Sequence, residues 1–422
     1  MSELQDQLAA LRQRMAKVME SSRNPRETPV FKGVSADFFP AQEWLPGEEI
    51  ATGLGKHYET ETFYASHRRH GSADIGSLAD LPHDLLEVIS NGAIRGVPPG
   101  EWAFLDTETT GLSGGTGTCA FLVGVGRITP EGFRVRQFFM RDYGEEASML
   151  SALASHLAPS RVLITYNGRT FDQPLLETRY RLNRSRLPLT RPPFAHMEHL
   201  DLLFGSRRLW KLRYESCRLI QLEQQVLGFE RQGDVAGAMI PYIYFDYIRT
   251  GEMDRLLPVF HHNVLDIVTL ACLTGIVPYA FKDPATAPLR HGSEMAGIAR
   301  WLRDAGELEQ ACALFRRAVD AGLSDDILFR TLWDIAALER KLERDEAALA
   351  VWNDLAACRN PFRVRALEEL AKHHEHRAKD HALALDLTRR ALALEPSEAL
   401  RKREERLLRK DSRAGPAPSS LR

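Results

Sequence analysis

The sequence predicts an α/β domain, a mixed β-sheet covered by helices, followed by an all-α region. Three strand-like runs at residues 103–106, 119–128 and 133–139 are joined by short polar turns. Helix-like and strand-like stretches then alternate up to about residue 183, and the chain after Pro284 is alanine-rich with helical periodicity. Consecutive strands that give way to alternating helices and strands are typical of a mixed sheet with helices on its faces.

Length and composition limit the classes of protein that the chain can represent. At 422 residues it fits two or three domains, and 44% hydrophobic residues are enough for full cores. The net charge of −2 excludes a uniformly basic nucleic-acid coat protein, although local basic patches are compatible with it. The five cysteines are scattered without a CxxC pair, which indicates neither a zinc site nor a disulfide framework. Because neither a signal peptide nor an apolar run of about 20 residues is recognisable, we expect a cytoplasmic protein without membrane contact.

The chain before residue 100 divides into two segments. Residues 1–22 are predicted to form an amphipathic helix, because apolar residues recur at spacings of three and four, namely Leu4, Leu8, Leu11, Met15 and Val18. This helix is expected to dock on the body of the protein rather than to pair with a second copy. Residues 23–99 are rich in proline and glycine without periodicity, so we expect an irregular segment that ends in a short helix at residues 81–90.

A pair of carboxylates stands at the end of the first strand-like run, in the sequence WAFLDTETTGL. Side chains alternate between the two faces of a strand, so Asp106 and Glu108 are expected on one face and Thr107 on the other. Two adjacent carboxylates repel each other, and a divalent cation between them removes that cost. Taken alone, a DxE is more often a strand that runs into a polar turn, so its interpretation depends on what the rest of the chain supplies.

Two further acidic residues occur in comparable contexts. In LITYNGRTFDQPLL, a second strand-like run is followed by Asn167 and then by Asp172 at the start of a helix. In HHNVLDIVTL, Asp266 lies within a helix, with His262 four residues and His261 five residues before it. Residues four apart share a helix face, so His262 is expected on the same side as Asp266.

The three motifs, in this order and context, resemble the DEDD superfamily of 3′–5′ exonucleases, whose members have a ribonuclease H-like fold. The stretches HLDLLFGSRRLW, LEQQVLGFERQGDVAGAMIPYIYFDYIRTG and HHNVLDIVTL are similar to the bacterial YprB-like branch of ribonuclease H-like proteins. The resemblance covers residues 100–284 well and the helical tail loosely, and it does not explain the segment before residue 100. It implies that four carboxylates hold two Mg²⁺ or Mn²⁺ ions and that a nearby histidine is the base. These carboxylates are Asp106, Glu108, Asp172 and Asp266.

The identity of the base is left open between two neighbouring histidines. One DEDD group places a histidine five residues before the last aspartate, which here is His261, and another places a tyrosine four residues before it, which here is His262. We prefer His262 because it shares a helix face with Asp266 and because the following asparagine resembles the pattern of the branch. A neutral histidine with a pKa near the operating pH can take a proton from the attacking water.

Residues around the acidic motifs are candidates for contacts with nucleic acid. Asn167 is placed to hydrogen-bond a phosphate or an edge of the site, whereas Phe171 is expected in the core rather than as a stacking platform. The segment 178–197 contains no acid and suits a surface that follows a phosphate backbone, although a solvated face explains it equally well. Its basic residues are Arg179, Arg181, Arg184, Arg186 and Arg191. Trp210 and Tyr214 interleave with a second basic cluster and are assigned to neither base stacking nor the core.

Residues 288–410 are predicted to form a helical-repeat domain. Three segments rich in small residues begin at Ala311, Ala348 and Ala382, which are 37 and 34 residues apart, and each follows another helical segment. This spacing resembles a tetratricopeptide-type array of about three units, in which small residues let paired helices approach closely. We expect the repeats to recruit a protein partner or to position the substrate, and residues 411–422 to be disordered.

These expectations together describe a metal-dependent nuclease with a ribonuclease H-like domain at residues 100–285. The leading hypothesis is a 3′–5′ exonuclease that hydrolyses single-stranded or unpaired nucleic-acid ends by a two-metal-ion mechanism. A structure-specific endonuclease, and a catalytically inactive scaffold for nucleic acid or protein, are the alternatives. The residues do not choose between DNA and RNA, because recognition of the 2′-hydroxyl depends on contacts that the sequence does not place.

Overall fold

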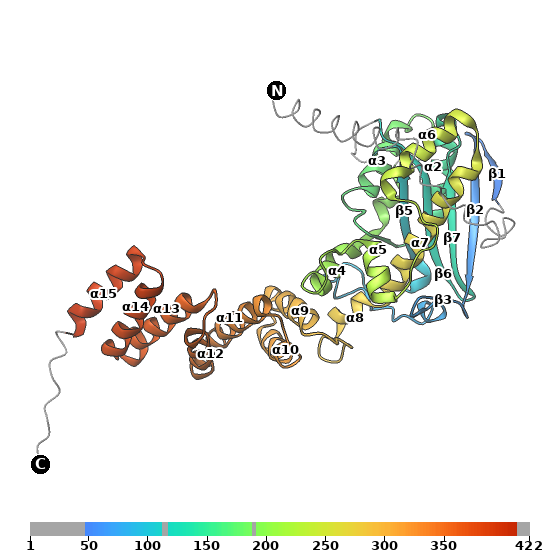
Figure 1. The fold of residues 1–422 in the computed structure, drawn as a ribbon. Helices are drawn as coiled ribbons and strands as arrows, with labels where there is room; N and C mark the ends of the chain where they lie inside the picture. The colour runs from blue at the N-terminus through green and yellow to red at the C-terminus, as the bar shows by residue number, and fades with distance from the viewer. Residues whose placement is uncertain (1–46, 112–116, 188–190, 412–422) are drawn as a thin grey trace, which may run out of the picture.

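The computed structural model describes residues 47–111, 117–187 and 191–411 of the chain. They form a seven-stranded sheet packed with helices, and an all-helical C-terminal region that extends away from the sheet as an elongated arm (Figure 1). The predicted α/β sheet domain and the predicted all-α region are both confirmed. The predicted helix at residues 1–22 lies outside the described residues. So does the predicted disordered tail, apart from Asp411, which ends the last helix.

The sheet is mixed, with antiparallel strands on one side and parallel strands on the other. Its order is β1-β2-β7-β6-β5-β8-β9. The strands are β1 (Gly47–Thr52), β2 (Gly55–Ala65), β5 (Trp102–Thr109), β6 (Ala120–Thr129), β7 (Gly132–Phe139), β8 (Val162–Thr165) and β9 (Glu198–Asp201). A separate small hairpin pairs β3 (Arg69–His70) with β4 (Ala73–Asp74). Because β5 is antiparallel to β6 and parallel to β8, the two parts of the sheet meet at β5.

Residues 47–65 correct one expectation, because they form β1 and β2 within the segment predicted to be irregular. β2 pairs with β7 over eight residue pairs. Polar residues hid this strand in the sequence, since it buries His57 and Thr60 rather than large apolar side chains. Residues 81–90, predicted as a short helix, form turns.

Helices cover both faces of the sheet. On one face lie α2 (Glu146–Leu157) and α3 (Asp172–Leu182), whose apolar side chains form one cluster with side chains of β5, β6 and β7. On the other face, α7 (Leu257–Thr274) crosses β5 and β6. The chain reaches α7 from β9 through α4 (Leu202–Trp210), α5 (Leu219–Leu222) and α6 (Ile240–Thr250).

Two glycines of β6 allow α7 to approach the sheet very closely. A Cβ atom at Gly124 would lie 2.2 Å from Asn263 Oδ1, and one at Gly126 would lie 2.5 Å from Ile267 Cγ2. Side chains at these positions would therefore force the helix away from the strands. Backbone contact, rather than a layer of side chains, sets the position of α7 over β5 and β6.

One apolar segment of the chain satisfies the length and composition of a membrane span. It is Met253–Lys282, which includes α7 and α8 (Val277–Lys282), with a mean hydropathy of 1.9 in its most apolar window. This departs from the expectation that no such stretch exists. Because 78% of that window is buried inside the protein, the segment packs here as a core element.

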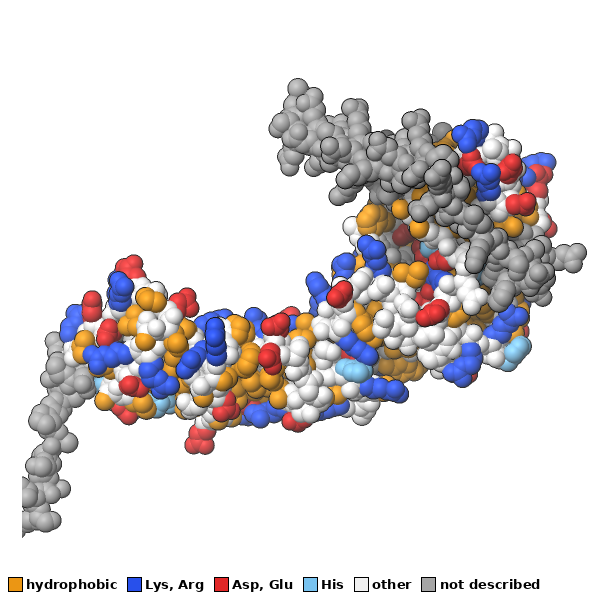
Figure 2. Space-filling model, in the orientation of Figure 1, with side chains coloured by type: hydrophobic (Ala, Val, Ile, Leu, Met, Phe, Trp, Pro, Cys, Tyr) orange, Lys and Arg blue, Asp and Glu red, His pale blue; other side chains and the backbone are white. Residues whose placement is uncertain are grey.

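The C-terminal arm consists of seven helices that pack mainly against their neighbours in the sequence. They are α9 (Gly292–Ala305), α10 (Leu308–Asp320), α11 (Asp325–Lys341), α12 (Asp345–Ala357), α13 (Arg363–His373), α14 (His381–Leu394) and α15 (Glu398–Asp411). Figure 2 shows basic and acidic side chains intermixed along the visible face of the arm, without a continuous patch of one sign.

The hydrophobic core does not stop at the domain boundary expected near residues 285–288. One cluster continues from α7 into α9, α10 and α11, and includes Ile298 and Phe315. α9 packs closely on α4, because a Cβ atom at Gly297 would lie 2.2 Å from the Arg208 carbonyl oxygen. A second cluster, which joins α11 to α15, begins farther along the arm. The first helical pair thus belongs to the core of the sheet domain.

Candidate active site

Asp106 lies on β5 and faces α7. It stands opposite Gly124 of β6, the glycine that lies against Asn263. The side-chain amide of Asn263 donates to Asp106 Oδ2 at 2.8 Å, while its Oδ1 accepts from Gln137 Nε2 at 2.9 Å. Because Asn263 is fully buried, this bridge fixes the Asp106 carboxylate between the sheet and the helix.

Asp172 approaches the same strand from the other face. It is the first residue of α3, and the hydroxyl of Thr107 donates to its Oδ1 at 2.5 Å. Thr107 therefore points to the face opposite that of Asp106, as the alternation along β5 predicts. The strand and the helix start are joined directly by this one contact.

The loop that delivers Asp172 is anchored by another carboxylate. Asp201, at the end of β9, accepts from the backbone N–H of Asn167 at 2.8 Å and of Arg169 at 3.2 Å. Asn167 has a φ of 70°, a left-handed conformation that asparagine adopts more readily than most residues. Its position beside the acidic motif is as predicted, and its conformation gives it a structural reason to be asparagine.

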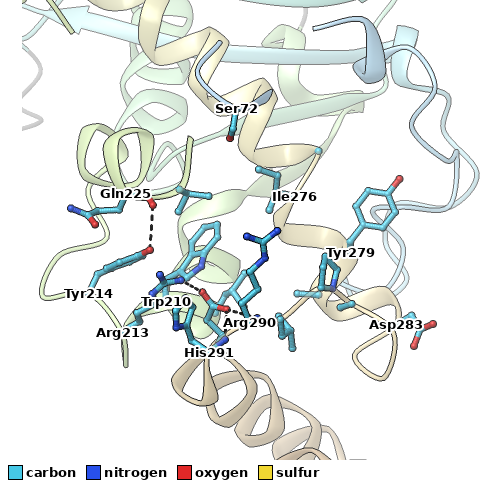
Figure 3. A pocket seen from close by; sticks show the side chains of 18 of the residues that line it. Ser72, Trp210, Arg213, Tyr214, Gln225, Ile276, Tyr279, Asp283, Arg290 and His291 are labelled. Carbon is cyan, nitrogen blue, oxygen red and sulfur yellow. Dashed lines mark hydrogen bonds and ion pairs between the residues drawn. The ribbon is translucent and has the colours of Figure 1, made fainter. Parts of the chain in front are cut away.

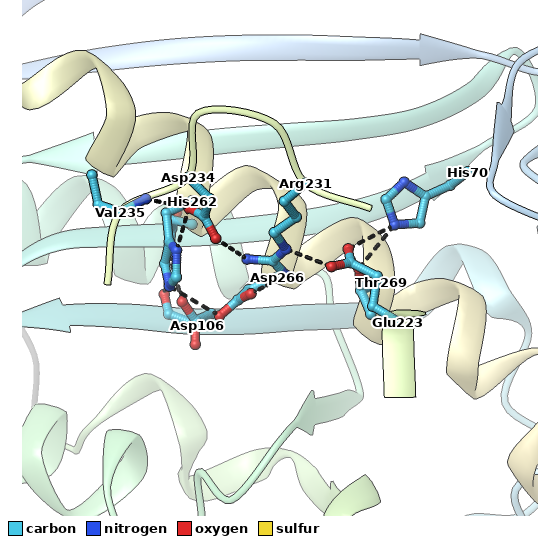
Figure 4. A network of polar contacts seen from close by, with 10 residues as sticks. His70, Asp106, Glu223, Arg231, Asp234, Val235, His262, Asp266 and Thr269 are labelled. Atoms are coloured by element: carbon cyan, nitrogen blue, oxygen red, sulfur yellow. Dashed lines mark hydrogen bonds and ion pairs between the residues drawn. The ribbon is translucent and has the colours of Figure 1, made fainter. Parts of the chain in front are cut away.

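Asp266 lies on α7 and belongs to a polar network (Figure 4). Its Oδ1 accepts from Arg231 Nη2 at 2.5 Å, and its Oδ2 lies 3.7 Å from His262 Nε2. The other ring nitrogen of His262, Nδ1, is 2.7 Å from Asp234 Oδ1. His262 therefore shares a helix face with Asp266, and it is held between two carboxylates.

Arg231 extends the network away from the acids. Its guanidinium also contacts Asp234 at 3.2 Å and Glu223 at 2.5 Å, and Glu223 in turn bonds to His70 and Thr269 (Figure 4). The Arg231 side chain is only 3% exposed. Burial alone would lower its pKa, but the surrounding carboxylates outweigh burial and raise it. Arg231 is thus a permanent buried cation that neutralises part of the local negative charge.

Three of the four predicted acids, Asp106, Glu108 and Asp172, have raised pKa values. Burial raises the pKa of Asp106 well above its ordinary value, and the neighbouring carboxylates, Asp266 first, raise it further. Burial also raises the pKa of Glu108 to about 8, with the His262 charge opposing this shift and the Asp266 charge adding to it. Burial raises the pKa of Asp172 to about 6. A bound cation relieves this mutual destabilisation of ionised carboxylates.

The two candidate histidines differ in charge. Burial lowers the pKa of both rings, but in His262 the hydrogen bond to Asp234 and the charges of Asp266 and Glu108 outweigh it and raise the pKa to about 9. In His261 burial dominates, and the pKa falls to about 4. At neutral pH, His262 is therefore an imidazolium that faces the acids, whereas His261 is neutral.

The donor set fits divalent cations, although the acids are held by protein groups in this conformation. Among the described residues, no three His, Cys, Asp or Glu side chains are gathered as a preformed metal shell. Instead, Asn263, Thr107 and Arg231 each donate to one of the acids. Carboxylate oxygens are the ligands that Mg²⁺ and Mn²⁺ prefer, and the buried excess of negative charge favours cations of this kind.

The predicted nucleic-acid-binding arginines have different environments. Arg179 pairs with the buried Glu146 at 2.5 Å and is 13% exposed, so it holds α3 on α2 instead of facing a ligand. Arg181 is 72% exposed and pairs loosely with Glu177 at 3.3 Å. The other described members of the run, Arg184, Arg186 and Arg191, are exposed.

The exposure of Phe171 and Trp210 shows whether each side chain belongs to the core. Phe171 was expected in the core, but it is 54% exposed directly before Asp172, because the turn into α3 directs it outward. Trp210, which the sequence left undecided, is 3% exposed and is a core residue. Of these two residues, Phe171 is the one that is exposed next to a predicted acid.

Several residues that hold the site were not predicted. Arg231 and Asp234 occur in an irregular segment between α5 and α6, where no periodicity marks them. Asn263 directly follows the two histidines, and that adjacency was the one usable signal. Thr107 was placed on the correct face, but its contact with Asp172 requires knowledge of where α3 packs.

A cavity of about 730 Å³ lies apart from the acids, where α4, α8 and the start of α9 meet. Figure 3 shows Trp210, Tyr214 and Arg290 among the side chains that line it. None of the four acids and neither candidate histidine lines this cavity. It is therefore separate from the chemistry described above.

Comparisons with known proteins identify the family. Residues 103–277 match the family RNase_H_2, described as RNase_H superfamily. The chain is also 33% identical over 339 residues to the protein of Bacillus subtilis (strain 168) named "Uncharacterized protein YprB", and the match covers 79% of each chain. Residues 103–277 contain all four acids and both histidines. The chain therefore belongs to one family with YprB, and its residues 103–277 form a ribonuclease H superfamily domain, which favours a nuclease-type function.

Proposed function

We propose that the protein is a metal-dependent 3′–5′ exonuclease of the DEDD type that acts on single-stranded or unpaired nucleic-acid ends. The observation that carries the proposal is the convergence of four carboxylates from three separate motifs around the end of β5. Asp106 and Glu108 come from the strand itself, Asp172 from the start of α3, and Asp266 from α7. Burial and the charges of the other acids raise the pKa of Asp106 and of Glu108, as expected for carboxylates gathered in one site.

The four carboxylates would hold two Mg²⁺ or Mn²⁺ ions. When bound, such ions activate water, neutralise charge on the phosphate and stabilise the leaving 3′ oxygen. The protein's part is to hold the oxygen ligands in place: Asn263 orients Asp106 and Thr107 orients Asp172. Arg231 orients Asp266, and its positive charge offsets part of the repulsion between the carboxylates.

His262 is the proposed base. Its Nε2 faces Asp266, and Asp234 fixes the orientation of the ring from the other side. The charges of Asp266 and Glu108 contribute to its raised pKa, so cations placed on these acids would lower that pKa toward neutrality. His262 would then accept a proton from water in the state in which the site is loaded.

The surroundings of the acids suit a single strand. Phe171 is exposed next to Asp172 and offers a face for an unpaired base. Arg184 and Arg186 follow α3 and are exposed to solvent, where they can contact a phosphate backbone. We further propose that the paired helices of the arm act as a tetratricopeptide-like surface for a protein partner.

The proposal is tested with full-length protein, Mg²⁺ or Mn²⁺, and single-stranded DNA and RNA labelled at the 5′ or the 3′ end. We expect mononucleotides to be released from the 3′ end, and Asp106→Asn and Asp266→Asn to reduce the rate by at least about 100-fold. Asp386→Asn, which changes an exposed carboxylate on α14 of the arm in the same way, is the matched control. No release by the wild type under any of these conditions would instead support an inactive scaffold.

A circular single-stranded substrate separates the two nuclease alternatives. An exonuclease requires an end and should leave the circle intact. Linearisation of the circle with the same sensitivity to Asp106→Asn would assign the site to a structure-specific endonuclease. Comparing linear DNA and linear RNA in the same panel identifies the preferred sugar.

A further inference from the structure

A basic cavity of about 440 Å³ lies at the end of β6 and β7 remote from Asp106. Arg127, Arg134, Arg136 and His156 line it, together with one carboxylate, that of Glu61. The three arginines come from two paired strands, and the histidine comes from the end of α2. The guanidinium groups are therefore mounted on rigid elements rather than on a loop.

The register of the strands places like charges against each other. Arg127 of β6 stands directly opposite Arg134 of β7, and Arg136 follows two residues later on the same face of β7. Like charges directly opposite each other in an antiparallel pair are destabilising. An arrangement that costs stability needs a compensating group.

Glu61 supplies only part of that compensation. It accepts from Arg134 at 2.8 Å and from Arg136 at 2.9 Å. Within the described part of the chain, Arg127 has no carboxylate within ion-pair distance. Its guanidinium makes only long contacts, of 3.4 and 3.5 Å, to the backbone oxygens of Gly100 and His156.

His156 adds a second unsatisfied group to the same cavity. Its Nε2 is buried and has no hydrogen-bond partner among the described residues. Burial, followed by the charges of Arg136 and Arg127, lowers the pKa of His156 to about 4, so the ring is neutral at pH 7. The ring therefore adds no positive charge of its own to the wall of the cavity, where the cations are the three arginines.

We propose that this cavity binds a phosphate group, carried by a free nucleotide or by a nucleic-acid strand. Guanidinium groups match phosphate oxygens with paired, charge-assisted hydrogen bonds. The volume lies within the usual range for small-ligand sites. The phosphate would supply the negative charge that Arg127 lacks.

This site is separate from the four acids and does not rest on the proposed nuclease function. Gly124 and Gly126 face α7, so Arg127, next along β6, faces the side of the sheet covered by α2. Arg127 also lies three residues beyond Gly124, the partner of Asp106, which is roughly 10 Å along a strand. A ligand in the cavity therefore does not contact the acids directly.

The test uses full-length protein in EDTA, so that no cleavage occurs, with inorganic phosphate, AMP and a fluorescent single-stranded oligonucleotide as probes. Thermal unfolding reports phosphate and AMP binding, and anisotropy reports oligonucleotide binding. We expect Arg127→Gln to weaken the binding of at least one of these probes by at least about 5-fold. Arg161 is an exposed arginine that pairs with Glu101 outside the cavity, and Arg161→Gln should bind every probe as the wild type does.

The source of the phosphate is read from which probe changes. If the cavity binds free nucleotides, AMP and phosphate should no longer stabilise Arg127→Gln against thermal unfolding, whereas its affinity for the oligonucleotide should be unchanged. A strand-binding site loses oligonucleotide affinity, and its logarithmic salt slope falls by about one. Without ligand, Arg127→Gln should melt at or above the wild-type temperature, because the opposed charges are relieved.

A variant that keeps the positive charge tests whether a loss of binding comes from misfolding. Arg127→Lys retains a cation but not the planar fork, and should weaken the same probe while melting like the wild type. If both Arg127 variants bind all three probes as Arg161→Gln does, the cavity has no phosphate site and the proposal is wrong.

Discussion

Three of the four acids are each held by one side chain that donates a hydrogen bond. Asn263 does this for Asp106 and Thr107 for Asp172, while Arg231 holds the acid on α7. The acids could be predicted from the sequence because carboxylates at strand ends and on a helix face are recognisable. Their donors could not, because an Asn, a Thr and an Arg acquire this role only when separate elements pack together.

The two histidines give a prediction at the residue scale. His262→Ala should reduce the turnover of a single-stranded substrate with Mn²⁺ by about 100-fold or more, because its Nε2 faces Asp266. His261→Ala should lose less than about 10-fold, since that ring is on a different face of α7. Single-turnover rates of both variants, with circular dichroism to confirm folding, provide the measurement. A larger loss for His261→Ala would make His261 the base.

Glu108 gives a prediction about pH. Its pKa rises from 4.5 in the unfolded chain to about 8 in the fold, mainly through burial, so the folded state binds this proton more tightly. The resulting stabilisation is complete below about pH 4.5 and is lost as pH rises through 8. In EDTA at pH 8.5, Glu108→Gln should therefore be more stable than the wild type by on the order of a few kcal/mol.

The same comparison at pH 4.5 is the control for Glu108, because the wild-type side chain is then protonated and the difference should vanish. Mn²⁺ should stabilise the wild type at pH 8.5 more than it stabilises the variant. Urea unfolding at the two pH values measures both effects. Equal stability of the two proteins at pH 8.5 would mean that the Glu108 carboxylate is not destabilised in the fold.

At the scale of elements, the sheet domain illustrates which strands can be recognised from sequence. β5, β6 and β7 were predicted because apolar runs between turns are a strong signal. β1, at the edge of the sheet, and its neighbour β2 were missed because they bury few large apolar residues. Their antiparallel addition to β7 is a tertiary event that local periodicity does not report.

The contact between β6 and α7 gives a prediction at this scale. Gly124→Ala would place a Cβ atom 2.3 Å from Ile267 Cδ1 and closer still to Asn263 Oδ1, so α7 must move. We expect a loss of about 1–3 kcal/mol in the free energy of unfolding and a strong loss of metal-dependent activity. Gly237→Ala, where the added Cβ has open space, is the control. Unchanged urea unfolding of Gly124→Ala would show that the sheet and helix can separate there.

At the scale of the whole molecule, the core runs from the sheet into the first helices of the arm. The sequence correctly indicated helices after residue 284, but it placed a boundary where the composition changes. Composition does not reveal that Ile298 and Leu302 of α9 pack into the same cluster as α7. The repeat spacing therefore predicted the secondary structure better than the domain limits.

Truncation tests this continuity. A chain that ends at residue 343 keeps α9, α10 and α11 and should remain folded and monodisperse. A chain that ends at residue 287 exposes the apolar faces that meet α9, and should aggregate or melt at least about 10 °C lower. Size-exclusion chromatography and thermal unfolding distinguish the two. Equal behaviour of both truncations would show that the sheet domain folds independently of α9.

The close contact between the β6 glycines and α7 also bears on how relatives of this protein can diverge. Because backbone contact, buried bridges and Arg231 fix the spacing of the acids, substitutions on the surface leave that spacing unaltered. The exposed side chain of Phe171, the run that follows α3 and the arm beyond α11 hold none of the acids in place. Sequence change in these regions can therefore alter the proposed substrate and partner contacts while the arrangement of the four acids stays the same.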